Sequence, residues 1–429
     1  MESKLNPPNP SAEPAALPPG GLLVVTVDRL PAWMLATYGA TWVSTPALDT
    51  LAARGVVFDR VIATSPDPHD VLHDLGDQLF AATGGWPAAV VTDDPVVAAG
   101  LVAATAGGPA ASVRLVEAAA KAEVEENDSQ TNIARLVDAA IDVVVAGTHR
   151  LVWCHIGSLA VAWDAPEPYR DRYIDPEDPP PPSGALVPGF AVDADTDPDR
   201  VVGMRQVFAG QITLLDSQLA RLFATTRQGT GSEGDWAVVV VGVRGLPLGL
   251  HGWVGVGGRE LPYGELIHLP AIFADAAGRM AAQRYGGLVV PADLGCTLRD
   301  WLADATGSQA PSPAVDAASP WLGRSLAGLF DNWSVRGRDR VVVAGPDGAA
   351  IVTPAWHCLL ATEPTEPDTP RDHNHAVRLF AKPDDFFELA DVANRCSDVV
   401  GPLGDLLERV IAGESRAVWV TPLPAELQG

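Results

Sequence analysis

The chain has 429 residues, with 29 basic and 54 acidic side chains and a formal net charge of −25. So negative a charge excludes a typical duplex nucleic-acid binder, because phosphate contacts need basic patches. Apolar residues make up 47% of the chain, which is ample for a buried core and excludes wholesale disorder.

The first 20 residues are rich in proline and predict a disordered tail. They contain no apolar segment of the kind that forms a signal peptide, and no run of roughly 18 apolar residues occurs anywhere in the chain. The cysteines lie far apart without CxxC spacing, which argues against a disulfide framework or a cysteine-rich zinc site. We therefore expect a cytoplasmic protein with no membrane partner.

Four short, continuous apolar runs predict central strands that are buried on both faces. They are Gly21–Val27, Ala88–Thr92, Leu151–Ile156 and Ala237–Val243. Helical patterns lie between them, at Thr45–Arg54, Asn132–Val145 and Phe208–Phe223. Strands that alternate with helices indicate an α/β fold with a mostly parallel sheet.

Stretches rich in proline, glycine and alanine predict loops at 105–112, 164–199 and 307–320. After the last of these, Arg340–Ala344 and Gly348–Thr353 predict a hairpin, Val377–Lys382 a strand and Pro402–Ala412 a helix. We therefore divide the chain into a tail (1–20), a large α/β domain (21–330) and a small C-terminal α+β subdomain (331–429).

No P-loop, GxSxG or HExxH motif is present, nor is GxGxxG after a strand. His69 and His73 are spaced to share one helix face, as zinc-binding pairs do, but a solvated acidic helix turn is the interpretation that we prefer. Asp28 follows the first predicted strand, at the strand end where sites form in open α/β sheets. It is a candidate metal or catalytic carboxylate, or else a turn residue.

An ordered set of segments resembles the sulfatase family of the alkaline-phosphatase-like superfamily, over about residues 21–412. The N-terminal part of the resemblance lies in LVVTVDRL (23–30), Tyr38-Gly39, TPALDTLAA (45–53) and GVVF (55–58). It continues through 208–222, GLPLGLHG (245–252), 269–272, GRSL (323–326) and 377–393. The resemblance implies the sulfatase fold: a central, mostly parallel sheet flanked by helices, with a small C-terminal subdomain.

In that family a formylglycine nucleophile attacks the sulfate ester, and a calcium ion held by acidic and amide or imidazole side chains clamps the sulfate oxygens. A hard cation of this kind needs several oxygen ligands. The first calcium-binding aspartate of the family matches Asp28, but the second matches Arg29. The family's later Asp-His pair falls on Val243 and Arg244.

The family's nucleophile position falls near Pro68, which has no nucleophilic atom, and the lysine of its WGKG segment falls on Val256. His155 and His251 match family histidines. The resemblance thus leaves a remnant site of Asp28, Arg29, His155, Arg244 and His251, without a catalytic residue. Calcium is expected for the family, but its ligands are mostly missing here, so we predict no cofactor.

We expect Arg29 or Arg244 to pair with Asp28 in place of the metal, within about 4 Å. The leading hypothesis is a sulfatase-like pseudoenzyme that binds a protein partner or serves as an inactive subunit. One alternative is an active ester hydrolase with a rearranged or metal-dependent site, for which His69 and His73 are the metal candidates. Another is a protein that binds a small anion without turnover, using the arginines and histidines of the remnant site.

Overall fold

The computed structural model describes residues 20–80, 86–104, 111–175, 177–227, 235–306, 323–330, 335–362 and 377–427. The predicted tail therefore lies almost wholly outside the described residues, as do the predicted linker 307–320 and most of the loop 105–112. No helix among the described residues is both long enough and apolar enough to cross a bilayer.

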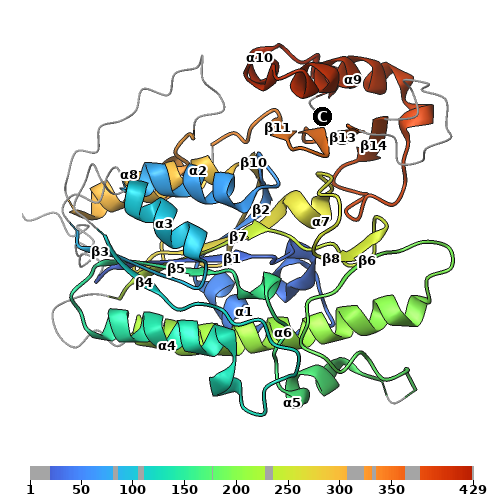
Figure 1. Cartoon of the computed structure of the whole chain (residues 1–429). Helices are drawn as coiled ribbons and strands as arrows, with labels where there is room; N and C mark the ends of the chain where they lie inside the picture. Colours follow the sequence, from blue (N-terminus) through green and yellow to red (C-terminus); the bar gives the residue numbers. More distant parts are fainter. Residues whose placement is uncertain are drawn as a thin grey trace, which may run out of the picture.

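An eight-stranded mixed sheet forms the centre of the molecule (Figure 1). In spatial order its strands are β10 (Gln283–Val289), β2 (Val56–Ile62), β9 (His268–Ala274), β7 (Ala237–Arg244), β1 (Leu22–Asp28), β5 (Leu151–Ile156), β3 (Ala88–Thr92) and β4 (Ser112–Leu115). Only β9 runs antiparallel to its neighbours, β2 and β7. The four predicted runs became β1, β3, β5 and β7, which are buried almost throughout because helices cover both faces.

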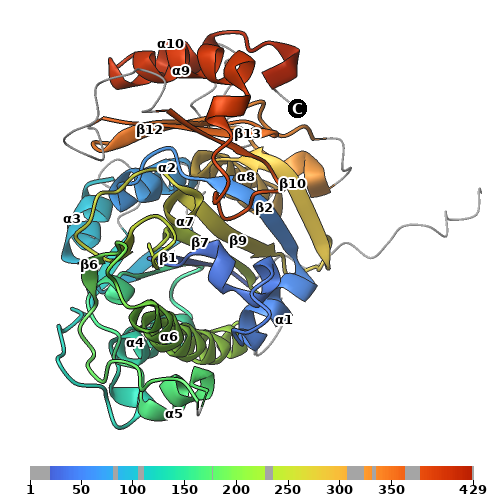
Figure 2. The same cartoon turned by 90° about the vertical axis from the view of Figure 1, so that its right-hand side faces the viewer.

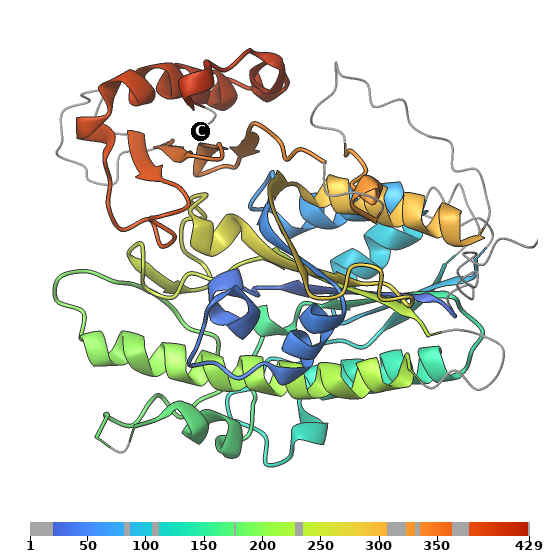
Figure 3. The same ribbon diagram turned by 180° about the vertical axis from the view of Figure 1, so that it is seen from behind.

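Two sets of helices cover the faces of this sheet (Figures 1 and 3). One face carries α2 (Pro68–Phe80), α3 (Pro95–Ala104) and α8 (Pro291–Thr306). The other carries α1 (Pro46–Arg54), α4 (Asn132–Val145) and α6 (Pro198–Thr225), with α5 (Glu167–Arg170) outside α6. Helix α6 is longer than the predicted Phe208–Phe223, since Asp197 caps an extra N-terminal stretch that begins with Pro198.

A second, antiparallel sheet lies above the first (Figure 2). It contains β11 (Val341–Ala344), β12 (Gly348–Val352), β13 (Trp356–Ala361) and β14 (Val377–Ala381), and is covered by α9 (Ser397–Ile411) and α10 (Ser415–Val420). Strands β11 and β12 form the predicted hairpin. One cluster of buried apolar side chains runs from β2, α2 and α8 into this second sheet, so the two layers share a core.

Short elements complete the fold. The pair β6 (Gly189–Ala191) and β8 (Trp253–Gly255) forms a small ribbon, and α7 (Gly264–Ile267) precedes β9. The segment 164–199, predicted as a loop, contains α5, a 3-10 helix (Asp171–Tyr173), strand β6 and the start of α6, with irregular stretches between them.

Candidate functional site

The carboxyl end of the central sheet places Asp28 beside Arg244. In the β1–β7 pair, Val27 lies opposite Gly242 but Asp28 lies opposite Arg244, so one residue of β7 is skipped. A bulge of this kind re-aims the side chains at the end of a strand. The Arg244 Nε and Nη2 donate to the two carboxylate oxygens of Asp28 at 3.1 and 2.9 Å. This bidentate pair lies within the distance expected from the sequence.

Arg29 takes a different partner. Its Nη2 donates to Glu260 Oε1 at 2.7 Å, and the same oxygen accepts from Arg244 Nη1 at 2.8 Å. The four side chains therefore form one chain of ion pairs, Asp28–Arg244–Glu260–Arg29, which we call the ion-pair cluster. Arg29 adopts a φ of 60° in the left-handed region, a strained conformation for a residue with a Cβ.

Burial and charge act together on the cluster. Asp28 and Arg29 are only 6% and 5% exposed. Burial alone would raise the pKa of Asp28, but the charge and hydrogen bonds of Arg244 outweigh it and hold that pKa below its ordinary value. Burial likewise opposes the charge of Arg244, yet Asp28 raises its pKa overall. Asp28 and Arg244 are thus both charged at neutral pH.

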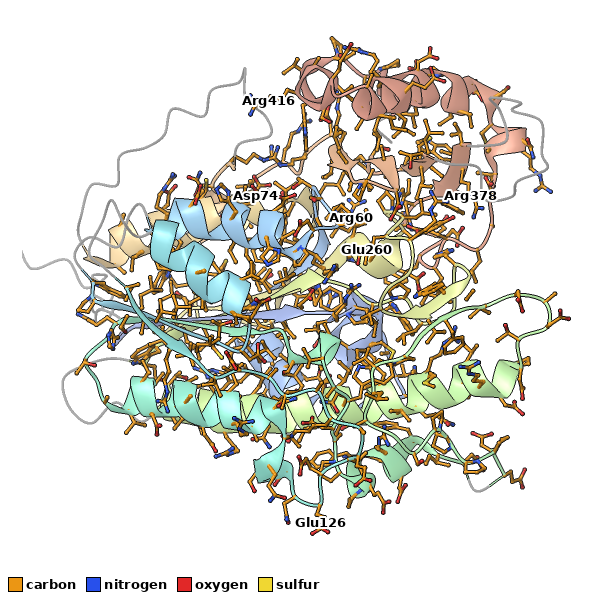
Figure 4. All side chains as sticks on the ribbon, viewed as in Figure 1. Arg60, Asp74, Glu126, Glu260, Arg378 and Arg416 are labelled. Atoms are coloured by element: carbon orange, nitrogen blue, oxygen red, sulfur yellow. The ribbon has the colours of Figure 1, made fainter. Side chains whose placement is uncertain are left out.

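Glu260 connects the cluster to the second sheet. Its backbone N–H donates to Asp347 Oδ2 at 2.7 Å, and Asp347 lies in the turn between β11 and β12. Figure 4 labels Glu260 on the side of the central sheet that faces this layer. Sequence reasoning missed Glu260, because it comes from a loop without periodicity or a motif.

His155 lies in β5, next to β1, and is buried. Its Nδ1 is 3.0 Å from Thr26 Oγ1, which also accepts from Trp153 Nε1 at 2.8 Å. Burial lowers the pKa of His155 to about 4, and the charge of Asp28 only partly opposes this. The ring is therefore neutral at pH 7 and held in place by the neighbouring strand.

Asp93 is a second carboxylate at the same edge that sequence reasoning missed. It follows β3 directly, and Asp28 is the last residue of β1, so the rule that sites form at strand ends, which pointed to Asp28, could also have found Asp93. Its oxygens accept from the backbone N–H groups of Gly157 and Ser158 at 2.6 and 3.1 Å. Burial raises its pKa to about 6. Asp93 thus fixes the loop after β5, directly beyond His155.

The other predicted residues lie at different places. His251 stacks on Tyr263 at 3.7 Å between ring centroids and lies 3.9 Å from Glu388, at the boundary with the second sheet. Pro68 is the first residue of α2. On that helix, the His69 Nδ1 lies 3.0 Å from Asp67 and the His73 Nε2 lies 3.1 Å from Asp77.

The ion-pair cluster does not fit a calcium ion. Calcium in proteins takes about six to eight oxygen ligands. Both carboxylate oxygens of Asp28 already accept hydrogen bonds from the Arg244 guanidinium. Glu260 is engaged by two arginines, whose positive charges would repel a divalent cation. Among the described residues, no three His, Cys, Asp or Glu side chains are grouped to hold a metal.

Solved structures with a similar fold include phosphonate monoester hydrolases and a sulfatase. The phosphonate monoester hydrolase of Agrobacterium radiobacter aligns with a TM-score of 0.66 and 16% identity, over 95% of this chain and 98% of that one. The chain has the sulfatase fold. The phosphonate monoester hydrolase SpPMH from Silicibacter pomeroyi gives 0.63 and 17%, over 92% and 95%, and a 2-O GAG sulfatase gives 0.58 and 16%, over 94% of both chains.

Comparison of the sequence alone finds no relative of this sulfatase-fold chain. No protein-family model matches the sequence, and no curated protein matches it either. Identities of 12–17% between the chain and similar structures establish a common architecture, while activity depends on the site.

Proposed function

We propose that this chain is a sulfatase-fold protein that has lost sulfuric-ester hydrolysis and keeps a binding or structural role. The observation that carries the proposal is the bidentate Asp28–Arg244 pair. Both oxygens of Asp28, which matches the family's first calcium ligand in the sequence, accept hydrogen bonds from Arg244. The proposal includes two further expectations. The protein binds no calcium ion, and Pro68 stands where the family has its catalytic nucleophile.

The arginines supply the positive charge that a metal ion would otherwise bring to this end of the sheet. A carboxylate buried at the sheet end without a counter-charge would be costly, so loss of the metal calls for another cation. Arg244 supplies that charge, and Glu260 compensates the charge of Arg29. The cluster is then internally neutral, with two carboxylates and two guanidinium groups, and folds without an ion.

The alternative of an anion-binding pocket has less support from the same contacts. Arg244 already donates from Nε, Nη1 and Nη2 to carboxylates. Its charge is thus compensated within the protein, and a sulfate would have to displace Asp28 or Glu260.

A rearranged, metal-dependent hydrolase is tested directly by assay. Purified protein would be incubated with 4-nitrophenyl sulfate, 4-nitrophenyl phosphate and a phenyl phosphonate monoester, with Ca²⁺, Mn²⁺ or EDTA. We expect no turnover above the buffer blank in any condition. Turnover that EDTA abolishes, and that is absent from the Asp28→Asn or His69→Ala variant purified in parallel, would overturn the proposal and exclude a contaminating hydrolase.

A further inference from the structure

A cavity of about 490 Å³ lies between the central sheet and the second sheet. Strands β2 and β10 form one wall, and the turn after β12, the start of β13 and the loop after β14 form the other. None of its lining residues belongs to the ion-pair cluster. Its volume falls within the range of small-molecule pockets, which favour boundaries between structural units.

Arg60 gives this cavity its distinctive charge. Its Nε donates to the Gly286 carbonyl at 2.7 Å and its Nη1 to the Pro354 carbonyl at 3.1 Å, so β2 is bridged to β10 and to the second sheet. In the described part of the chain it has no ion-pair partner, because the neighbouring Asp59 is paired with Arg284 at 2.5 Å. Figure 4 labels Arg60 between the two layers.

The other charged groups of the lining are matched internally. Glu388 is 3% exposed and accepts from Lys382 Nζ at 2.9 Å, from the Gly264 N–H at 2.7 Å and from the His357 ring at 2.5 Å. Because these groups pair with one another, Arg60 remains a half-buried cation without an ion pair among the described residues, and it has guanidinium hydrogens to spare. A strongly acidic protein has thus kept a positive centre inside a cavity.

Apolar side chains form much of the remaining wall. Ile62, Leu288 and Val352 are 6%, 1% and 5% exposed, and Phe386 at the edge is 36% exposed. On β10, two lining residues are accessible to solvent: Arg284 is half-exposed and Gly286 is exposed. A ligand here would bury apolar surface and place an acidic group on a planar guanidinium.

We propose that this cavity binds a small organic anion, with its acidic group paired to Arg60 and its apolar body between Ile62, Leu288 and Phe386. A carboxylate or phosphate matches the fork geometry of the guanidinium. The site is independent of the proposed loss of ester hydrolysis, since it shares no residue with the ion-pair cluster.

Calorimetric titration with 2-naphthoate, compared with the uncharged 2-naphthylmethanol, tests the charge requirement. We expect saturable binding of naphthoate by the full chain and binding at least about tenfold weaker for the alcohol, the ratio that 1.4 kcal/mol represents. The Arg60→Gln variant should weaken naphthoate binding by a similar factor. Equal binding of both probes, or no saturable naphthoate binding at millimolar concentrations, would overturn the proposal.

A second variant locates the site without touching Arg60. A Cβ built at Gly286 meets only Asp59 Oδ2, at 3.9 Å, so Gly286→Phe should fill the cavity with little strain. The matched control is Gly401→Phe on the exposed face of α9, where a Cβ meets nothing within 4 Å. We expect Gly286→Phe to lose naphthoate binding and Gly401→Phe to keep it. Full binding by a folded Gly286→Phe protein would place the ligand elsewhere and refute the assignment.

Discussion

At the residue scale, several basic side chains bind buried carboxylates. Only three of the 29 basic residues are lysines. Two of them form ion pairs with buried carboxylates at 2.9 Å, Lys382 with Glu388 and Lys121 with Asp164. Arginines bind two further buried carboxylates with planar, bidentate geometry, in the Arg244–Asp28 and Arg338–Asp293 pairs. These side chains therefore stabilise the fold through specific partners.

The Arg244→Gln variant should destabilise the protein by about 3–5 kcal/mol, because it leaves Asp28 buried without a counter-charge. Urea unfolding would measure the change. Arg221→Gln is a matched control, since Arg221 and Asp138 form a pair that is 48% and 50% exposed. It should cost less than about 1 kcal/mol. Equal losses for the two variants would contradict a buried, stabilising cluster.

The buried carboxyl group of Glu265 on α7 should make the stability of the protein depend on pH. Burial raises its pKa to about 8, against an ordinary value of 4.5. Between these values the folded state keeps a proton that the unfolded state has released, so stability falls as the pH rises from about 5 to 8. The Glu265→Gln variant, whose amide oxygen can still accept from the Leu248 N–H, should show a shallower decline in unfolding free energy. An unchanged slope would contradict this assignment.

At the element scale, packing decides where glycine is needed in helix α6. A Cβ at Gly210 would meet the backbone of α5, at 2.9 Å from both Arg170 Cα and Tyr169 O. A Cβ at Gly203 meets only Pro181 and Pro182, at 3.4 Å or more. The same helix thus offers two glycines with opposite tolerance of a methyl group.

We expect Gly210→Ala to destabilise the protein by about 1–3 kcal/mol, since the α5 backbone must move. Gly203→Ala should instead stabilise it by up to about 1 kcal/mol, because alanine favours a helix over glycine. Urea unfolding of the two variants side by side measures both signs. A stabilising Gly210→Ala would show that α5 is not packed closely against α6.

The strands that could be predicted are those buried on both faces, such as β1 and β7, since a continuous apolar run marks them. Strand β2 was not predicted as an element, because Asp59 and Arg60 interrupt its apolar run. Both of these residues line the cavity. In the site, Asp28 was named from its place at the end of a predicted strand, and Arg29 and Arg244 were named from the resemblance. Their exact pairing, and the part of Glu260, depended on a bulge and a loop that leave no local pattern.

At the scale of the whole molecule, Glu388 ties the second sheet to the first. It adopts a φ of 58°, and its carboxylate accepts from α7, from β13 and from Lys382 after β14. Strain of this kind persists only where surrounding contacts maintain it. The resemblance had placed His251 in the remnant site, whereas it lies beside this carboxylate.

The Glu388→Gln variant should loosen the second sheet, because Lys382 and His357 lose a buried counter-charge. Hydrogen exchange should speed up in β13 and β14 more than in β1 and β5. Glu414→Gln, which removes an exposed pair with Arg409, serves as the control and should leave exchange unchanged. Uniform acceleration over both sheets would indicate that Glu388 acts on global stability alone.

The central claim is that an ion-pair cluster stands where the sulfatase resemblance places calcium. Equilibrium dialysis of the full chain against calcium, followed by elemental analysis, tests it most directly. The account predicts no stoichiometric calcium in the wild-type protein, as both oxygens of Asp28 are bonded to Arg244. One tightly bound calcium ion per chain, lost in the Asp28→Asn variant, would contradict it.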